Sequence, residues 1–184
     1  RRVLHADALH DLLLVLGDCS EAELEARCDP SASLSPMLEA LIRERRVVAM
    51  RIAGQARYVA VEEVARYRDA LGAVVPPGLP SALPGPVENA LAGLVARYAR
   101  THGPFEASVL GARYGIATDP LTTVLRALHF SGKIVEGSFR PGSMHREYCD
   151  AEVLRQIKRA SLAKLRRQVE PVPVAALARF ALSW

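Results

Sequence analysis

The sequence predicts a mainly α-helical α+β fold made of two similar units, each of which carries a small β-hairpin. In each half of the chain, short segments with apolar residues at helical spacing precede two short β-patterned runs. The order of these segments is repeated along the chain, as in an internal repeat. Between the copies lies "AVVPPGLPSALPGP", residues 73–86, whose five prolines and two glycines can sustain neither a helix nor a sheet ladder. We therefore expect a stiff, extended linker there.

The first copy begins with "HADALHDLLLVLG", whose leucines recur at helical spacing up to Gly17, a residue suited to a helix C-terminus. Ser20 and Glu23 form the capping-box pattern of a short second helix. Ser33 is expected to cap a third helix, whose inward face is Leu34, Leu38, Leu41 and Ile42. Next, "RVVAMRI", "AGQ" and "ARYVAV" predict a hairpin with strands near residues 46–52 and 56–61, and "EEVARYRDALG" predicts a closing helix.

The second copy follows the same order. "VENALAGLVARYARTHG" and "EASVLGARYG" predict two helices, and "TDPLTTVLRALHF" predicts a third, with Thr118 or Asp119 as its cap and Pro120 at its first position. "KIVEGSF", "RPGS" and "MHREYC" predict a hairpin with strands near 133–139 and 144–149, followed by a long helix to about Gln168. In this alignment Leu41 matches Leu128 and Val47 matches Ile134, both 87 positions on, whereas Tyr58 matches Tyr148 at 90.

Three helices followed by a β-hairpin form the winged-helix version of the helix-turn-helix. In this fold the third helix can enter a major groove, and the hairpin, called the wing, lies along the backbone or minor groove. We predict a winged-helix domain over residues 1–72, the linker over 73–86, a second winged-helix domain over 87–170 and the start of a further element over 171–184. Because many winged helices bind proteins instead of DNA, the surface residues must decide between the two.

The charges of the two units differ. The net charge of +4 combines 10 Lys and Arg against 12 Asp and Glu in residues 1–86 with 14 against 8 in residues 87–184. The third helix of the first unit turns Ser35, Glu39, Arg43 and Glu44 outward, and the turn of its hairpin carries no charge. Carboxylates at that place repel phosphate, which favours a packing or partner surface.

The second unit is the predicted DNA-binding unit, because the outward face of its third helix lacks acidic residues. Its wing adds four basic side chains against Glu136 and Glu147. The residues predicted to bind nucleic acid are Thr122, Thr123, Arg126, Lys133, Arg140, His145 and Arg146. Arg140 precedes Pro141 and Gly142 at the wing tip, so we expect its side chain to protrude without a packing role.

Several kinds of chemistry are not indicated. The sequence has no GxxxxGK[ST] loop and no Asp-Glu pair after a buried strand, so we do not expect ATP hydrolysis. Its three cysteines lack CxxC spacing and its five histidines lack HExxH spacing, which predicts buried free thiols, no metal site and no cofactor. We interpret Asp119 and Asp150 as helix caps and nominate no catalytic residue.

We expect a cytoplasmic location and no membrane partner, since no apolar run approaches the roughly 18 residues that span a bilayer. The sequence starts at Arg1 and stops at Trp184 soon after a new helical pattern begins, so we expect a piece of a longer protein.

Several stretches carry a resemblance to a known family. "HADALHDLLLVLGDCSEAEL", "LVARYARTHGPFEASVLGARYG" and, most specifically, Gly132 to Phe180 resemble the region downstream of the motor in bacterial large helicase-related (Lhr) proteins. These are superfamily 2 ATP-dependent DNA helicases linked to DNA repair. The resemblance implies two RecA-like motor domains, with ATP and magnesium, outside this chain, and a C-terminal region of tandem winged helices and a β-barrel. Tandem winged helices also resemble a class of bacterial DNA glycosylases.

Three hypotheses follow from these observations. The chain is an accessory module that binds and positions single- or double-stranded DNA for a repair helicase. Alternatively, it is a scaffold that docks onto other domains of the same chain or onto a second copy, using the apolar tail "VPVAALARFALSW". In the third hypothesis it supplies one wall of a glycosylase-like processing site. A free-standing transcriptional regulator is a weaker fourth reading.

Overall fold

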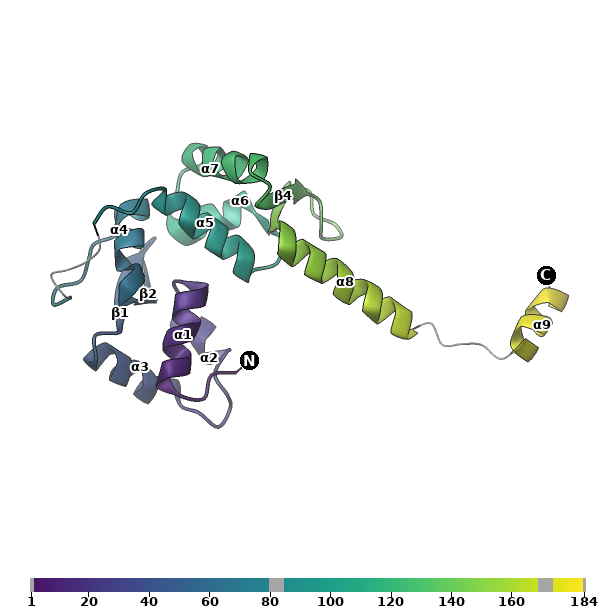
Figure 1. Ribbon diagram of the computed structural model, residues 1–184, viewed down its shortest axis with the longest axis horizontal. Coiled ribbons are helices and arrows are strands. Elements are labelled where there is room, and N and C mark those ends of the chain that lie inside the picture. Colours follow the sequence, from purple (N-terminus) through teal and green to yellow (C-terminus); the bar gives the residue numbers. More distant parts are fainter. Residues whose placement is uncertain (1, 80–84, 169–173, 184) are drawn as a thin grey trace.

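The computed structural model describes residues 2–79, 85–168 and 174–183, and its α+β architecture of two winged-helix units confirms the predicted fold class (Figure 1). The first unit comprises α1 (Ala6–Leu16), α2 (Glu21–Glu25), α3 (Leu34–Arg43), β1 (Val47–Ile52), β2 (Gln55–Ala60), the 3-10 turn η1 (Val61–Glu63) and α4 (Val64–Leu71). The second comprises α5 (Ala90–Thr101), β3 (Phe105–Glu106), α6 (Ala107–Tyr114), α7 (Thr118–Phe130), β4 (Ile134–Gly137) and β5 (Glu147–Asp150). The helices α8 (Ala151–Gln168) and α9 (Val174–Ser183) follow.

The internal repeat is confirmed at the level of single residue pairs. Val47 pairs with Ala60 in the first hairpin, and Ile134 pairs with Asp150 in the second. Likewise, Tyr58 and Tyr148 occupy the same place in their hairpins, opposite Ala49 and Glu136. The turns before the hairpins also correspond, because the Arg46 amide donates to the Leu41 carbonyl at 2.9 Å and the Lys133 amide donates to the Leu128 carbonyl at 3.0 Å.

The sheets differ from the prediction in one strand. β3 pairs antiparallel with β5, so the second unit has a three-stranded sheet in the order β3-β5-β4. We expected helices here and missed this strand, because two residues are too short to display a period-two pattern. In the first unit, a single bridge between Cys19 and Tyr58 takes the corresponding place.

The predicted helix caps are partly correct. The capping box of α2 is confirmed, since the Glu23 amide donates to Ser20 Oγ at 3.2 Å and the Ser20 amide donates to Glu23 Oε2 at 2.8 Å. The caps predicted for α7 are wrong: Ala117 is the N-cap, and Pro120 is the third helical residue. Pro120 is tolerated because the amides of the first turn have no partner within the helix.

Other local expectations need correction. Ser33 occupies the N-cap position of α3, but its side chain makes no capping hydrogen bond. Ile42, which we expected to face inward, is 44% exposed, while Met37 is buried.

The two units share a hydrophobic core. α4 packs against α5 (Figure 1), and one buried cluster combines Met50, Ile52 and Tyr67 of the first unit with Leu94 and Tyr98 of the second. The remaining part of the first unit encloses its own core between α1, α2 and α3. The first hairpin therefore packs against the second unit, which agrees with the packing role expected for the first unit.

The described part of the predicted linker belongs to this contact. Residues 73–79 and 85–86 form neither helix nor strand, and Ala73, Val75 and Leu79 pack against the shared cluster. Residues 80–84 of the predicted linker lie outside the described residues. The domain boundaries themselves stay a prediction.

A buried ionic cluster closes the contact between the units. Asp18, 1% exposed, follows α1, and its Oδ2 lies 2.9 Å from Arg113 Nη2 and 3.2 Å from Arg57 Nη1. Its Oδ1 accepts hydrogen bonds from the hydroxyls of Tyr67 and Tyr114, each at 3.1 Å. Because Arg113 and Tyr114 belong to α6, these bonds cross from one unit to the other. We call Asp18, Glu23, Arg57, Tyr67, Arg113 and Tyr114 the interunit clamp.

Charges balance within the interunit clamp. Arg113 donates to Glu23 Oε1 and to the Asp18 carbonyl, both at 2.7 Å, so two guanidinium groups face two carboxylates. Burial opposes ionisation of Glu23, yet hydrogen bonds from Arg113 and from the Ser20 amide lower its pKa from 4.5 to about 2. Burial raises the pKa of Tyr114, which keeps its hydroxyl protonated as a donor.

Gly17 is needed beside the interunit clamp for two reasons. Its φ of +89° lies in a region that residues with a Cβ atom rarely adopt. A Cβ atom at this position would lie 2.5 Å from the Tyr67 hydroxyl. The glycine thus lets the end of α1 approach the tyrosine, whose hydroxyl accepts from the Asp18 amide at 2.7 Å.

Arg113→Met should strongly destabilise the chain. Losing the guanidinium leaves two carboxylates with one cation, and breaking a buried ion pair from one side costs about 3–5 kcal/mol. Urea denaturation of the 184-residue chain measures this loss. Arg43→Met, on the exposed face of α3, is the control and should change stability by less than about 0.5 kcal/mol. Similar losses for both variants would contradict the importance of the interunit clamp.

Acid should weaken the same cluster. Because the folded pKa of Glu23, about 2, lies below its ordinary value of 4.5, its contribution to stability is complete above pH 4.5 and is lost as the pH falls towards 2. In urea titrations across this range, Glu23→Gln should show a shallower decline of the unfolding free energy than the unchanged chain. Parallel declines would show that Glu23 does not carry this dependence.

Candidate nucleic-acid interface

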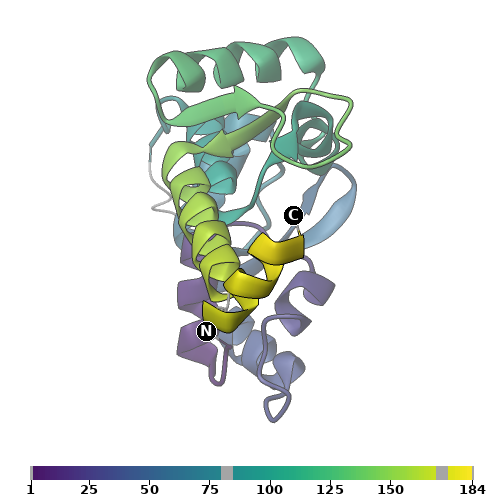
Figure 2. The same ribbon diagram turned by 90° about the vertical axis from the view of Figure 1, so that its right-hand side faces the viewer.

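The exposed face of α7 carries several of the predicted site residues. Leu121, Leu125 and Leu128 are buried against the second unit, so the side chains between them point outward. Figure 2 shows α7 as the outermost element of this unit, beyond β4 and β5. The hydroxyls of Thr122 and Thr123 donate to the carbonyls of Thr118 and Asp119, at 2.8 and 3.0 Å. Each hydroxyl oxygen keeps acceptor capacity, whereas its donor is used inside the helix.

Two predicted cations on this surface are exposed and unpaired. Arg126 lies on the outward face of α7, and Lys133 follows in the turn before β4. Neither side chain forms an ion pair or hydrogen bond with any residue that the structure describes. Their charges are therefore available to an external anion.

The wing arginines are already paired. Arg140 Nε donates to Glu147 Oε1, and Glu147 Oε2 accepts from the amides of Phe139 and Arg140 at 2.7 and 2.9 Å. Burial opposes ionisation of Glu147, yet these bonds hold its pKa below the ordinary value. The expectation that Arg140 has no packing role is wrong, because its guanidinium compensates a carboxylate with 0% exposure. Arg146 pairs with Glu136 across the hairpin.

The remaining wing residue of the prediction, His145, is exposed next to Met144, which is 93% exposed. Charges from both the wing and α7 act on Tyr148 of β5. Burial and Glu136 raise the pKa of this tyrosine, whereas Arg146 and Arg126 act to lower it. Arg126 of α7 and Arg146 of the wing thus lie within electrostatic range of the same side chain.

The first unit provides a matched comparison. The repeat puts Glu39 where the second unit has Arg126, and Arg46 where it has Lys133. Arg46 is neutralised, because its Nη1 lies 2.6 Å from Asp7 Oδ1 and 3.6 Å from Glu44 Oε2. At these two positions, Glu39 and Arg46, the first unit therefore has no unpaired cation that could contact a phosphate.

Sequence reasoning missed three arginines beside the end of α7. A polar cavity of about 350 Å³ is lined by side chains from α4, α5 and the turn after α7, including Arg66, Arg97, Arg100 and Lys133. Arg66 and Arg97 share the carboxylate of Glu63, at 2.8 and 2.5 Å. The spacing of Arg97 and Arg100 on one helix was the available signal.

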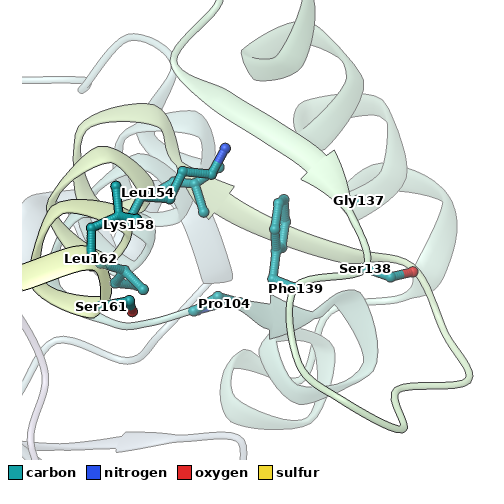
Figure 3. Close-up of a pocket in the computed structure, with 9 residues that line it drawn as sticks. Pro104, Gly137, Ser138, Phe139, Leu154, Lys158, Ser161 and Leu162 are labelled. Atoms are coloured by element: carbon teal, nitrogen blue, oxygen red, sulfur yellow. The ribbon is translucent and has the colours of Figure 1, made fainter. Parts of the chain in front are cut away.

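An apolar groove lies on another side of the second unit, between the wing and α8. Its volume is about 760 Å³, and Figure 3 shows Phe139 of the wing and Leu154 of α8 on opposite sides. The other lining residues are Pro104, Gly137, Ser138, Ile157, Lys158, Ser161 and Leu162. With one cation and no carboxylate in its lining, the groove suits an apolar segment of protein better than a phosphate.

A metal site is absent from the described residues. No three His, Cys, Asp or Glu side chains among them could hold one metal ion. The three cysteines are buried and free, and burial raises the pKa of Cys19 to about 12. Asp150 Oδ1 accepts from the amides of Glu152 and Val153 at 2.8 and 3.1 Å, as expected of a helix cap.

In the part of the chain that the structure describes, no helix is both long and apolar enough to cross a membrane.

Comparison with known proteins adds family information. Residues 1–86 match the family model described as "Large helicase-related protein, winged-helix domain". Over 184 residues the chain is 37% identical to "Lhr helicase/ probable uracil glycosylase" of Mycolicibacterium smegmatis. This match covers 100% of this chain and 12% of that protein. The chain is 28% identical to "Lhr helicase/uracil glycosylase" of Escherichia coli, in a match that covers 99% of this chain and 12% of that protein. The chain thus spans about an eighth of the length of these relatives.

Arg140→Ala should lower the urea denaturation midpoint, because Glu147 would stay buried with two backbone amides as its remaining partners. The matched control is Arg146→Ala, in which an exposed ion pair is lost and the midpoint should hardly change. Equal midpoints for the two variants would mean that the Arg140–Glu147 pair does not support the wing.

Proposed function

The chain belongs to the large helicase-related family, and we propose that it binds DNA and positions it for the helicase of which it forms a part. Winged-helix units commonly present a helix and a hairpin to nucleic acid. The two relatives are named as helicases, which supports a role next to a DNA motor. In this proposal DNA and the other domains of the helicase are the partners of the chain.

One observation carries the proposal. The second unit exposes Arg126 and Lys133 without an internal partner, whereas the corresponding residues of the first unit are Glu39 and the ion-paired Arg46. Binding to DNA gains most of its sequence-independent free energy when cations replace counterions on phosphates. A cation that already faces a carboxylate contributes less, since it must leave that carboxylate or share it.

The predicted site residues then divide by role. Arg126 and Lys133 contact phosphates from α7 and the following turn. Arg140 and Arg146 add weaker contacts, because each is paired with a glutamate. Thr122, Thr123 and His145 supply polar contacts from α7 and the wing. Phosphate contacts fix position and orientation without reading sequence, which suits a module that accompanies a moving motor.

The wider functions of the relatives are proposals for this chain. Since it spans 12% of their length, ATP hydrolysis with magnesium would belong to the rest of such a protein. We also propose that the chain acts in DNA repair in the cytoplasm and that it needs no cofactor of its own. A part in a glycosylase-like processing site, an activity that the relatives' names mention, is a further alternative for this chain.

A protein-docking role is the second candidate, because α8 leaves apolar side chains uncovered. Ile157, Leu162 and Leu165 of α8 are 38%, 53% and 57% exposed, and Leu154 and Phe139 line the adjoining groove. Such a surface fits another domain of the helicase or a second copy of the chain. Because it lies on α8 and the wing base, it is compatible with DNA binding at α7.

The salt dependence of binding tests the DNA proposal. On duplex DNA, Arg126→Ala and Lys133→Ala should each lower the slope of log affinity against log salt concentration by about 0.9. The affinity loss should be similar for unrelated sequences, since phosphates carry no base information. Fluorescence anisotropy at several salt concentrations measures both quantities.

Arg43→Ala on α3 of the first unit is the control and should leave affinity and slope unchanged. If the Arg126 and Lys133 variants keep the full slope, the DNA proposal fails and the docking role becomes the better explanation. If Arg43→Ala lowers the affinity and the salt slope as much as Arg126→Ala and Lys133→Ala do, the first unit also contacts DNA.

A further inference from the structure

An exposed aromatic ring stands among the unpaired cations at the end of α7. Phe130 is the last residue of α7 and is 87% exposed. Arg126 precedes it by one helical turn, and Lys133 follows it in the turn to β4. Lys133 also lines the polar cavity together with Arg100 of α5. We call Arg100, Arg126, Phe130 and Lys133 the α7-end patch.

The fold does not require this ring. Leu121, Leu125 and Leu128 fill the core beneath α7, and Phe130 belongs to neither hydrophobic cluster. Its one aromatic contact among the described residues is with His129, whose ring centroid is 6.1 Å away at an angle of 55°. The two rings are not stacked, so the faces of the phenyl ring are open. The corresponding residue of the first unit is Arg43, which shows that this position of the fold accepts a polar side chain.

The surroundings of the ring indicate what covers it. Arg100, Arg126 and Lys133 have no ion-pair partner among the residues that the structure describes. A protein partner would have to bury these charges together with the ring, at a high desolvation cost. An unpaired nucleotide can cover the ring and also neutralise the charges, because its base stacks on an aromatic face while the neighbouring phosphates contact the cations. Bases within a duplex are already stacked on one another and cannot cover the ring.

The polar cavity extends this site along α5. Glu63 is shared by Arg66 and Arg97, which leaves a net positive charge behind Arg100 and Lys133. Glu88 is the one carboxylate in the lining of the cavity. Four cations against these two acids leave the cavity positive, so it can accept backbone phosphates next to the end of α7.

We propose that the α7-end patch binds single-stranded nucleic acid, with Phe130 stacked on an unpaired base and with Arg100 and Lys133 holding neighbouring phosphates. This inference rests on the proposed DNA-binding function and specifies its substrate as a strand with unpaired bases. The positive cavity then guides the strand from α7 along α5 towards α4 of the first unit.

The test uses the 184-residue chain and two DNA probes. One is a single strand of thymidines with one 2-aminopurine, and the other is a blunt duplex of the same length. For the unchanged chain we expect binding to quench 2-aminopurine fluorescence in the single strand, as stacking does. Phe130→Ala should weaken single-strand binding roughly 5- to 150-fold and abolish the quenching, while duplex affinity changes little.

Two further variants separate stacking from other causes. Phe130→Trp should restore affinity and quenching, whereas Phe130→Leu, which keeps an apolar side chain without a ring, should behave like Phe130→Ala. Because the ring is exposed, all three variants should keep the urea denaturation midpoint of the unchanged chain. Arg43→Ala, at the matched position of the first unit, should leave both affinities as they are.

These measurements separate base stacking by Phe130 from the proposed DNA-binding function. If Phe130→Ala binds both probes like the unchanged chain while Arg126→Ala and Lys133→Ala weaken both, DNA binding stands and base stacking is overturned. If the unchanged chain binds neither probe, the proposed function fails and the inference fails with it. If Phe130→Ala alters sedimentation of the chain without altering DNA binding, the ring covers a protein surface and the inference is overturned.

Discussion

The pairing of Arg113 with Asp18 and Glu23 determines how the two winged-helix units are arranged. This guanidinium belongs to α6 of the second unit, and both carboxylates belong to the first. Buried charges are tolerated when they are mutually satisfied, so the partners must meet in one geometry. That geometry brings α4 onto α5 and buries the first hairpin in the shared cluster. The first unit thereby supports the second, and one face of α7 in the second unit remains exposed.

The repeat shows how one structural position serves two purposes. Arg57 and Glu147 are equivalent, since each faces the fourth residue of the opposite strand, Met50 or Gly137. Both are buried charged residues within the paired strands of a hairpin. Arg57 turns to Asp18 and joins the interunit clamp, whereas Glu147 holds Arg140 and the backbone of the wing. A buried charge thus ties the first hairpin to α1 and α2 and shapes the second hairpin internally.

Local patterns made most of the fold predictable. The capping box at Ser20, the glycine after α1 and both hairpins depend on neighbouring residues, so the sequence displays them directly. The interunit clamp was not predictable in this way, because Asp18 and Tyr114 lie 96 positions apart and no periodicity links them. β3 was missed because its two residues show no pattern, and its pairing with β5 is decided by tertiary structure.

The candidate site was predictable in part for the same reason. Counting charges on α7 and the wing identified the basic unit, but single charges in a sequence do not reveal which ones are neutralised. Glu136 and Glu147 were the available signal that two wing arginines would be paired. Phe130 was not selected, since an aromatic residue at the end of an amphipathic helix usually belongs to the core.

In the proposed complex, DNA contacts α7 and the wing of the second unit, and the first unit lies behind them. Photo-cross-linking to DNA that contains 5-iodouracil, followed by mass spectrometry of the cross-linked peptides, tests this placement of the DNA. We expect cross-links within residues 118–150, which hold α7, β4 and β5, and none within residues 34–60, which hold α3, β1 and β2. Cross-links concentrated in residues 34–60 would show that DNA binds the first unit instead.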